Sequence, residues 1–161
     1  MENINNFFIR EATRDDVEDI LQITKFAFTE YVKLAEIKTS DALSETYEDV
    51  LKDIENVQKM VIVAFLSGKI VGSARVEVFN DSTAYFSRFG VDTGYQNIGV
   101  GKAILNVVDS LMMQKKIKQL KLHTGSKITS LIRFYYGRGF YIDSVDKSRG
   151  YLRALLCKDY I

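Results

Sequence analysis

The feature that most constrains the fold lies in mid-chain, where a strand, a glycine-bearing turn and a helix follow one another between Arg88 and Leu105. The sequence there is RFGVDTGYQNIGVGKAIL, and Gly99 and Gly101 stand where a helical apolar pattern begins. The first turn of a helix has amides without intrahelical partners, and its dipole favours negative charge. Glycines let a phosphate approach such amides without meeting a Cβ atom. The stretch therefore predicts an anion-binding loop.

Two familiar phosphate-binding motifs do not fit this loop. A nucleotide P-loop has Gly, four residues, and then Gly-Lys followed by Ser or Thr. Here Gly101-Lys102 is followed by Ala103, which cannot hold magnesium, and Gln96 stands where the first glycine of that motif would be. A Rossmann fingerprint has three spaced glycines near the first strand of its unit, whereas this loop has two, deep in the chain.

Two segments together resemble the GNAT family of N-acetyltransferases. The first is Gln-x-x-Gly-x-Gly at 96–101, which is similar to the loop that holds the pyrophosphate of coenzyme A in that family. The second is Phe-Tyr-Tyr-Gly-Arg-Gly-Phe at 134–140, which is similar to the family segment F-Y-x-x-x-G-F. Two motifs in this order, about a helix and a strand apart, are more specific than either alone. The alternative for the first motif is an ordinary glycine-containing turn between a strand and a helix.

Hydrophobic periodicity predicts the element order β-α-α-β-β-β-α-β-α-β-β. Strands are expected near 7–9, 60–66, 70–78, 84–91, 118–124, 141–145 and 151–156. Helices are expected over 17–31, over 43–57, from 100 onward, and over 128–135. This order predicts an α/β (α+β) fold with a mixed six- to seven-stranded sheet and helices on both faces. It matches the GNAT order along nearly the whole chain.

Length and composition narrow the class of protein. The 161 residues predict one domain, 1–161. A net charge of +1 does not indicate a nucleic-acid partner, and no apolar run approaches the ~20 residues of a membrane span. No signal peptide is visible, and the single Cys157 forbids an internal disulfide, so a cytoplasmic location is expected. One cysteine and one histidine give no metal-ligand cluster.

The resemblance implies acetyl-CoA as the cofactor. In GNAT enzymes the pantetheine arm lies between two splayed strands, which here would be 84–92 and 118–124. The backbone of Phe89, Gly90 and Val91 would pair with that arm, and the Val91 N–H would stabilise the oxyanion as an amine attacks. The pyrophosphate would lie on the loop residues Gln96, Asn97, Ile98, Gly99, Val100, Gly101 and Lys102.

Tyr135 is the side chain that the resemblance assigns to catalysis. A thiolate leaving group needs a proton or a hydrogen bond, and a phenol near the sulfur can supply it. Tyr135 matches the family tyrosine by its place before Gly139-Phe140, whereas Tyr136 would point about 100° away around the helix. The alternative for Tyr135 is a core residue of an amphipathic helix, and Phe140 is expected to pack.

The sequence departs from the family pattern upstream of Tyr135. Many members carry Asn at the position of Ile128 and Ala at the position of Leu131. That Asn usually contacts the cofactor, so Ser126, Lys127 or Ser130 would have to replace the contact.

The general base is less clearly marked. Many family members have Glu on the strand before the glycine loop, but here that strand has no carboxylate before Asp92. Glu77 on the neighbouring strand could act as a base through water. The other candidates are Glu30, Asp81 and His123, each of which could equally be a solvated or structural side chain.

The resemblance implies an N-acetyltransferase that moves an acetyl group from acetyl-CoA to a primary amine by direct attack in a ternary complex. Tyr31 and Tyr47 fall where the family builds its acceptor pocket, although helix packing would explain them equally well. A small-molecule amine is the expected acceptor, and the protein is expected to be a monomer or homodimer. One alternative is a non-catalytic acetyl-CoA-binding sensor with the same fold. Another is an acyltransferase with a longer acyl donor or a non-amine acceptor.

Overall fold

A computed structural model describes residues 7–161 and contains one sheet with the strand order β1-β2-β3-β4-β5-β7-β6. The strands are β1 (Phe8–Glu11), β2 (Lys59–Leu66), β3 (Lys69–Val78), β4 (Thr83–Val91), β5 (Gln119–Gly125), β6 (Tyr141–Asp146) and β7 (Arg153–Asp159). The α-helices are α1 (Val17–Ala35), α2 (Tyr47–Glu55), α3 (Val100–Gln114) and α4 (Thr129–Gly137). β4 and β5 are parallel and the other neighbouring strands are antiparallel, so the predicted order and the mixed sheet are confirmed.

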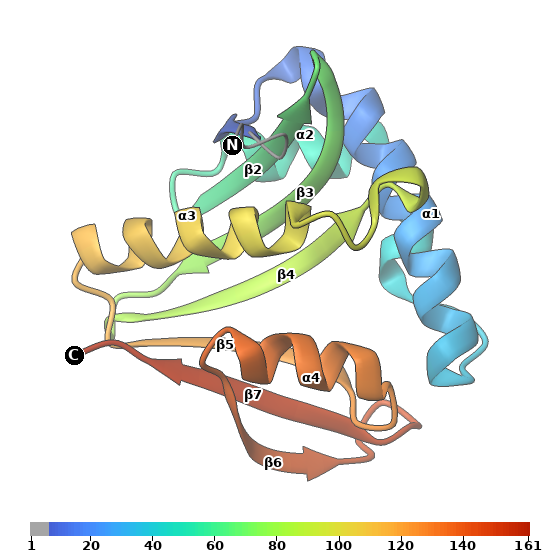
Figure 1. Cartoon of the computed structure of the whole chain (residues 1–161), viewed down its shortest axis with the longest axis vertical. Helices are drawn as coiled ribbons and strands as arrows, with labels where there is room; N and C mark the ends of the chain where they lie inside the picture. The colour runs from blue at the N-terminus through green and yellow to red at the C-terminus, as the bar shows by residue number, and fades with distance from the viewer. Residues whose placement is uncertain (1–6) are drawn as a thin grey trace.

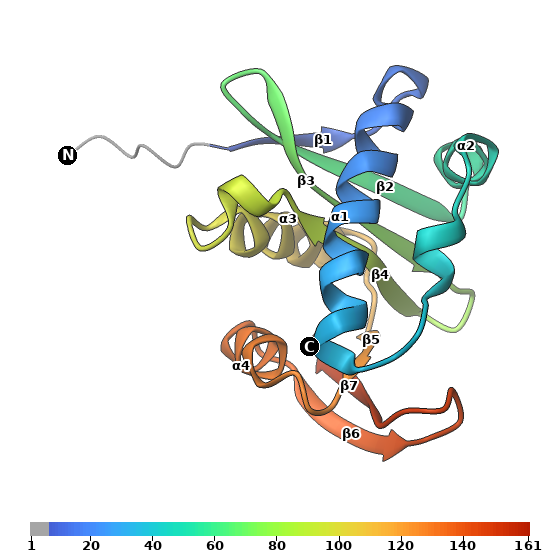
Figure 2. The ribbon, with the colours of Figure 1, turned by 90° about the vertical axis from the view of Figure 1, so that its right-hand side faces the viewer.

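Helices cover both faces of this sheet, as predicted (Figures 1 and 2). Period-two alternation along β2 separates two buried clusters. Val61 and Val63 pack with α1 and α2, while Ile62 and Ala64 pack with the apolar stripes of α3 and α4. None of the helices in residues 7–161 combines the length and apolar character that crossing a membrane requires.

The second predicted helix is shorter than its apolar pattern suggested. α2 begins at Tyr47 because Thr46 caps it, with the Asp49 amide donating to Thr46 Oγ1 at 3.2 Å and the Thr46 amide donating to Asp49 Oδ2 at 2.9 Å. Leu43 lies before this cap in the short 3-10 helix η2 (Asp41–Ser44), and Val57 lies beyond the helix end and is fully exposed. The prediction of one helix over 43–57 is therefore wrong at both ends, and the capping box is the reason for the later start.

The sheet opens between β4 and β5 (Figure 1). These two strands pair only from Thr83–Gln119 to Tyr85–Lys121 and then separate. On its other side, β4 contains a register shift against β3 at Arg88, whose φ of 52° is left-handed. The C-terminal half of β4 therefore forms one wall of an opening in the middle of the sheet, at the strand ends where α/β proteins bind ligands.

Candidate active site

A cavity of about 670 Å³ occupies the space between the end of β4, the loop before α3, and helices α1 and α4. We call it the loop cavity. It is lined by nine of the ten residues predicted to hold the cofactor, namely Phe89, Gly90, Val91, Gln96, Asn97, Gly99, Val100, Gly101 and Lys102. Ile98 is the exception, because its half-buried side chain packs against the core beneath the loop.

The loop presents the start of α3 to this cavity. Asn97 and Gly99 both have left-handed backbone conformations, with φ of 64° and 99°, and they turn the chain into the helix. The first intrahelical hydrogen bond of α3 runs from the Ala103 amide to the Gly99 carbonyl, at 3.0 Å. The amides that precede Ala103 in the first turn therefore have no partner within the helix. A Cβ atom on Gly101 would lie 2.8 Å from Phe89 Cζ, so only glycine fits this packing. Open amides and a helix dipole together fit a bound pyrophosphate, and the missing Cβ of Gly101 lets the Phe89 ring pack against this turn.

The backbone of β4 directs the Val91 amide into the opening. The Asp92 amide donates to the Val71 carbonyl at 2.8 Å, which makes Val71 and Asp92 a hydrogen-bonded antiparallel pair. The next pair along the ladder is Gly72 with Val91, and antiparallel pairs alternate between bonded and non-bonded. The Val91 N–H therefore points away from β3, toward the side on which β5 has separated.

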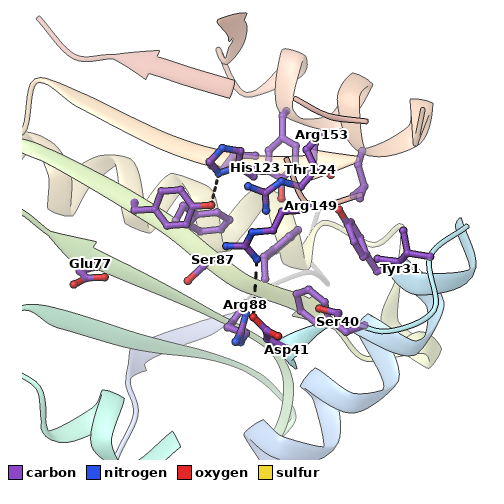
Figure 3. A pocket seen from close by; sticks show the side chains of 18 of the residues that line it. Tyr31, Ser40, Asp41, Glu77, Ser87, Arg88, His123, Thr124, Arg149 and Arg153 are labelled. Atoms are coloured by element: carbon purple, nitrogen blue, oxygen red, sulfur yellow. Dashed lines mark hydrogen bonds and ion pairs between the residues drawn. The ribbon is translucent and has the colours of Figure 1, made fainter. Parts of the chain in front are cut away.

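A second cavity, of about 520 Å³, lies on the side of the opening where the segment between α1 and α2 approaches the β6–β7 turn (Figure 3). We call it the polar cavity, because hydroxyl groups and several charged side chains line it. The charged residues include Glu77, Arg88, Arg149 and Arg153. The two cavities share the lining residues Phe28, Tyr31, Phe89 and Leu131. A ligand in one cavity can therefore meet a ligand in the other at the end of β4.

Tyr135 lines the polar cavity from α4 and is 5% exposed. Its ring packs edge-on against Phe134 and Phe140, with centroids 5.3 and 5.6 Å away, and it lies 6.3 Å from the Phe89 ring. Its hydroxyl has no hydrogen-bond partner within residues 7–161. Burial raises the pKa of Tyr135 well above its ordinary value, so its oxygen keeps the proton at neutral pH. Tyr136, one residue on, is 57% exposed, as the helical turn predicts.

A model of the acetyltransferase (GNAT) family matches residues 17–140. The chain belongs to this family. Its fold is similar to the PaiA N-acetyltransferase from Thermoplasma acidophilum in complex with coenzyme A, with 19% identity and a TM-score of 0.83 over 96% of this chain and 99% of that chain. An N-acetyltransferase from Staphylococcus aureus Mu50 has 19% identity and a TM-score of 0.78 over 96% and 99% of the two chains. A ribosomal-protein-alanine N-acetyltransferase from Brucella melitensis has 19% identity and a TM-score of 0.76 over 95% and 99%.

Family membership confirms three predictions made from the glycine loop and the element order: the GNAT family, the fold, and acetyl-CoA as the cofactor. This GNAT protein is accordingly an acyltransferase by family.

Two arginines that the sequence reasoning missed also line the loop cavity, together with the predicted Lys102. Arg133 and Arg138 reach it from α4 and its C-terminal end, and Lys102 reaches it from α3. Their charges suit the phosphates of coenzyme A. Both arginines flank the segment that contains Tyr135, so the signal was present in the second motif. Ser130 also lines this cavity, whereas Ser126 and Lys127 do not.

Of the two tyrosines predicted for the acceptor pocket, the structure brings only Tyr31 to the cavities. The Tyr31 hydroxyl accepts a hydrogen bond from the Gly125 amide at 2.9 Å and lies 3.0 Å from the Tyr151 hydroxyl. These contacts hold its ring where the two cavities meet. Tyr47, the first residue of α2, is 38% exposed and lines neither cavity.

The acidic candidates for the general base lie in different places. Glu77, on β3, is half-buried and lines the polar cavity, whereas Glu30 lines the loop cavity. Asp81 accepts hydrogen bonds from the amide and hydroxyl of Thr83 at 3.0 and 2.6 Å in the turn before β4. Of these three carboxylates, Glu77 is the one placed to meet an acceptor in the polar cavity.

His123 lines the polar cavity as well, and its position is clearer than the sequence suggested. Its Nδ1 lies 2.6 Å from the hydroxyl of Tyr85. Burial lowers the pKa of His123, and the positive charges of Arg153 and Arg149 lower it further. The pKa of Tyr85 is raised by burial, so the phenol donates and the neutral imidazole accepts. This pair joins β4 to β5 just beyond their last ladder contact.

A buried ionic network fixes the segment that leads into α2. Arg75, on β3, is 3% exposed, and its guanidinium forms a two-pronged contact with Glu45, with Nη2 to Oε1 at 2.6 Å. Arg75 Nη1 also donates to Asp53 at 2.9 Å, and Lys59 contacts the other oxygen of Asp53 at 2.9 Å. Arg88 lies 3.5 Å from Glu45. The network therefore ties the irregular residue of β4 to the segment between η2 and α2.

Proposed function

We propose that this GNAT protein transfers an acetyl group from acetyl-CoA to a primary amine by direct attack in a ternary complex. The observation that carries the proposal is the meeting of two cavities at Phe89. One cavity carries the anion-binding helix start and the other is lined by hydrogen-bonding and charged groups. A site that holds two ligands side by side lowers the entropic barrier to their reaction. The same proposal treats residues 1–161 as one domain that acts as a monomer or a homodimer.

The backbone of the loop cavity supplies binding and charge stabilisation. The amides of the loop and the first turn of α3 hold the pyrophosphate, and Lys102, Arg133 and Arg138 supply positive charge beside them. Acetyl-CoA brings a thioester, whose carbonyl carbon is open to attack by an amine. The Val91 N–H faces the opening and is a donor for the negative charge that develops on the carbonyl oxygen.

Two side chains transfer protons in this proposal, one as the acid and one as the base. Tyr135 keeps its proton at neutral pH and has no competing hydrogen bond in the described chain, so its hydroxyl is available to the departing sulfur. Glu77 lines the polar cavity and accepts the proton of the incoming ammonium through water. Because neither group forms a covalent bond to the acetyl group, the transfer needs both ligands bound together.

The size of the polar cavity supports a small acceptor. About 520 Å³ is the range of pockets that enclose small molecules. Some structural relatives are named for acetylating an alanine of a ribosomal protein, so a peptide N-terminus belongs in any acceptor screen.

The first experiment is a thermal-shift titration with acetyl-CoA, free CoA and ATP, followed by thiol release with a panel of amines. A ligand at 100 times its Kd adds about 2.7 kcal/mol to stability. For a domain of this size that raises the midpoint by roughly 5–11 °C. A shift with both CoA species and not with ATP, together with amine-dependent thiol release, is the expected result.

Two outcomes count against the proposal. A CoA shift without thiol release for any amine or peptide would favour the sensor alternative. An acetylated protein detected by mass spectrometry after incubation with acetyl-CoA alone would contradict direct attack, because it would show a covalent intermediate.

A further inference from the structure

Most of the charged side chains around the polar cavity are paired with one another. Lys59 contacts Asp53 at 2.9 Å, and Arg88 lies 3.5 Å from Glu45. Arg149 approaches Asp41 across the mouth of the cavity at 3.9 Å, and Asp41 is 87% exposed at its side chain (Figure 3). These pairs leave little uncompensated charge on the side of the cavity formed by α2 and the β6–β7 turn.

Arg153 is different, because it has no ion pair or side-chain hydrogen bond within residues 7–161. It begins β7 and lines the cavity beside His123 and Thr124 (Figure 3). Its Nε atom is buried without a hydrogen-bond partner, and so is the hydroxyl of the nearby Thr124. A buried donor without a partner is unfavourable, because it has lost its hydrogen bonds to water. Both groups would be satisfied by an acceptor atom inside the cavity.

The one carboxylate that faces Arg153 in the sheet is already engaged. Asp146 stands opposite Arg153 in the β6–β7 register. Its Oδ1 accepts hydrogen bonds from the amide and hydroxyl of Ser148 at 2.9 and 2.7 Å, and it forms no ion pair with Arg153 within the described chain. The charge of Arg153 lowers the pKa of Asp146 and also that of His123, so it acts on the cavity side of β5 as well as on the β6–β7 hairpin. Arg153 therefore places a positive charge that has no direct ion pair within the described chain beside neutral hydroxyl and imidazole groups.

Glu77 gives the same cavity a carboxylate from β3 that makes no direct ion pair within the described part of the chain, although Lys59 stands opposite it in the β2–β3 register. Figure 3 places Glu77 and Arg153 well apart in the cavity. An ammonium suits the Glu77 side, and a planar anion suits the Arg153 side.

The geometry points to an acceptor that carries a carboxylate as well as its amine, with Arg153 and Thr124 binding the carboxylate. This inference rests on the proposed function, because it names the substrate class of the same site. A guanidinium binds a carboxylate with two parallel hydrogen bonds. A carboxylate is favoured over a phosphate because Asp41 partly neutralises Arg149, and the single charge left on Arg153 matches a single negative charge.

The test compares amines that differ only by a carboxylate. The pairs are lysine with cadaverine, ornithine with putrescine, and phenylalanine with phenethylamine. Thiol release gives kcat/KM for each amine, and calorimetry on the CoA-saturated protein gives binding without chemistry. The variants are Arg153→Gln and the conservative Arg153→Lys, with Arg14→Gln as a control because Arg14 is exposed and lines neither cavity. A CoA-induced thermal shift in each variant shows that it is folded.

We expect the carboxylate member of at least one pair to bind and react better. Arg153→Gln should weaken that member by about 10- to 150-fold, the range for a hydrogen bond to a charged group, and change its partner less than about twofold. Arg153→Lys should restore part of the loss, and Arg14→Gln should match the parent protein.

The outcomes separate this inference from the proposed function. Equal use of both members of every pair, equal weakening of both by Arg153→Gln, or no binding of any carboxylate member overturns the inference. Acetylation of the amines that lack a carboxylate would then still support the function. Conversely, Arg153-dependent binding of carboxylates without any acetyl transfer supports the inference and counts against the function.

Discussion

Replacing Tyr135 with Phe removes a hydroxyl that makes no hydrogen bond within the described chain. The ring contacts with Phe134 and Phe140 are kept, because Phe has the same ring. We therefore expect the free energy of unfolding to change by less than about 1 kcal/mol, the net worth of a typical hydrogen bond. Binding of acetyl-CoA should also persist, because the loop and the start of α3 are untouched.

Turnover should respond very differently to Tyr135→Phe. A general acid contributes about 10²- to 10⁴-fold, which corresponds to roughly 2.7–5.4 kcal/mol on the barrier. The assay is thiol release at saturating acetyl-CoA and amine, with the CoA thermal shift measured on the same preparation. Tyr136→Phe is the matched control, since this neighbouring tyrosine is 57% exposed and lines neither cavity. An unchanged kcat would refute the role of Tyr135 as the acid, and an equal loss of kcat and cofactor binding would indicate packing instead.

Three further perturbations test other parts of the molecule. Gly101→Val places a Cβ 2.8 Å from Phe89 and should abolish the CoA thermal shift while destabilising the fold by about 1–3 kcal/mol. Gly94→Ala should do neither, because a Cβ there makes only an ordinary contact, 3.6 Å from Asp92 Oδ1. An unaltered CoA shift in Gly101→Val would contradict the role of this loop in binding the pyrophosphate. Arg75→Met breaks a buried ion pair with Glu45 and should lower the free energy of unfolding in urea by about 3–5 kcal/mol. A loss below about 1 kcal/mol would mean that the network carries little stability. The pKa of His123 is lowered from its ordinary value of 6.5 in the folded protein, so the unfolded chain binds the proton more readily. Protonation therefore favours unfolding, and the stabilising contribution of the neutral ring is lost as pH falls below about 6.5. His123→Gln should therefore flatten the fall in melting temperature between about pH 7 and pH 5, and identical profiles for the two proteins would contradict this reasoning.

The sequence predicts the element order well because turns and periodicity act locally. Ser67-Gly68 closes the β2–β3 hairpin with both residues at positive φ, and the apolar run before it forms the buried β2. Helix ends are less predictable from apolar spacing alone. Leu43 and Val57 continue the pattern of α2, yet the hydrogen bonds of Thr46 start the helix four residues after Leu43. The capping box outweighs hydrophobic periodicity at that end.

Site features made by the backbone were also predictable, because the glycine spacing in the loop indicates a helix whose first amides are free to bind an anion. Side chains brought together by distant pairing were not. His123 and Arg153 lie beside the same cavity because the register of β5 with β7 pairs Gly125 with Arg153. Nothing within either segment indicates that register. In the same way, both Tyr31 and Tyr47 fit helix patterns, and only the path of the chain after α1 separates them.

The irregularity at Arg88 connects these two kinds of feature. A non-glycine residue at φ 52° is strained by about 1–3 kcal/mol, and it persists only where its surroundings hold it. Here the buried Glu45, fixed by Arg75, lies beside the Arg88 guanidinium. The register shift at Arg88 precedes the ladder pairs that turn the Val91 amide toward the opening. The ionic network under α2 thus supports a backbone geometry that serves the cofactor side of β4. No glycine marks the position, so the chain gives no local sign of it.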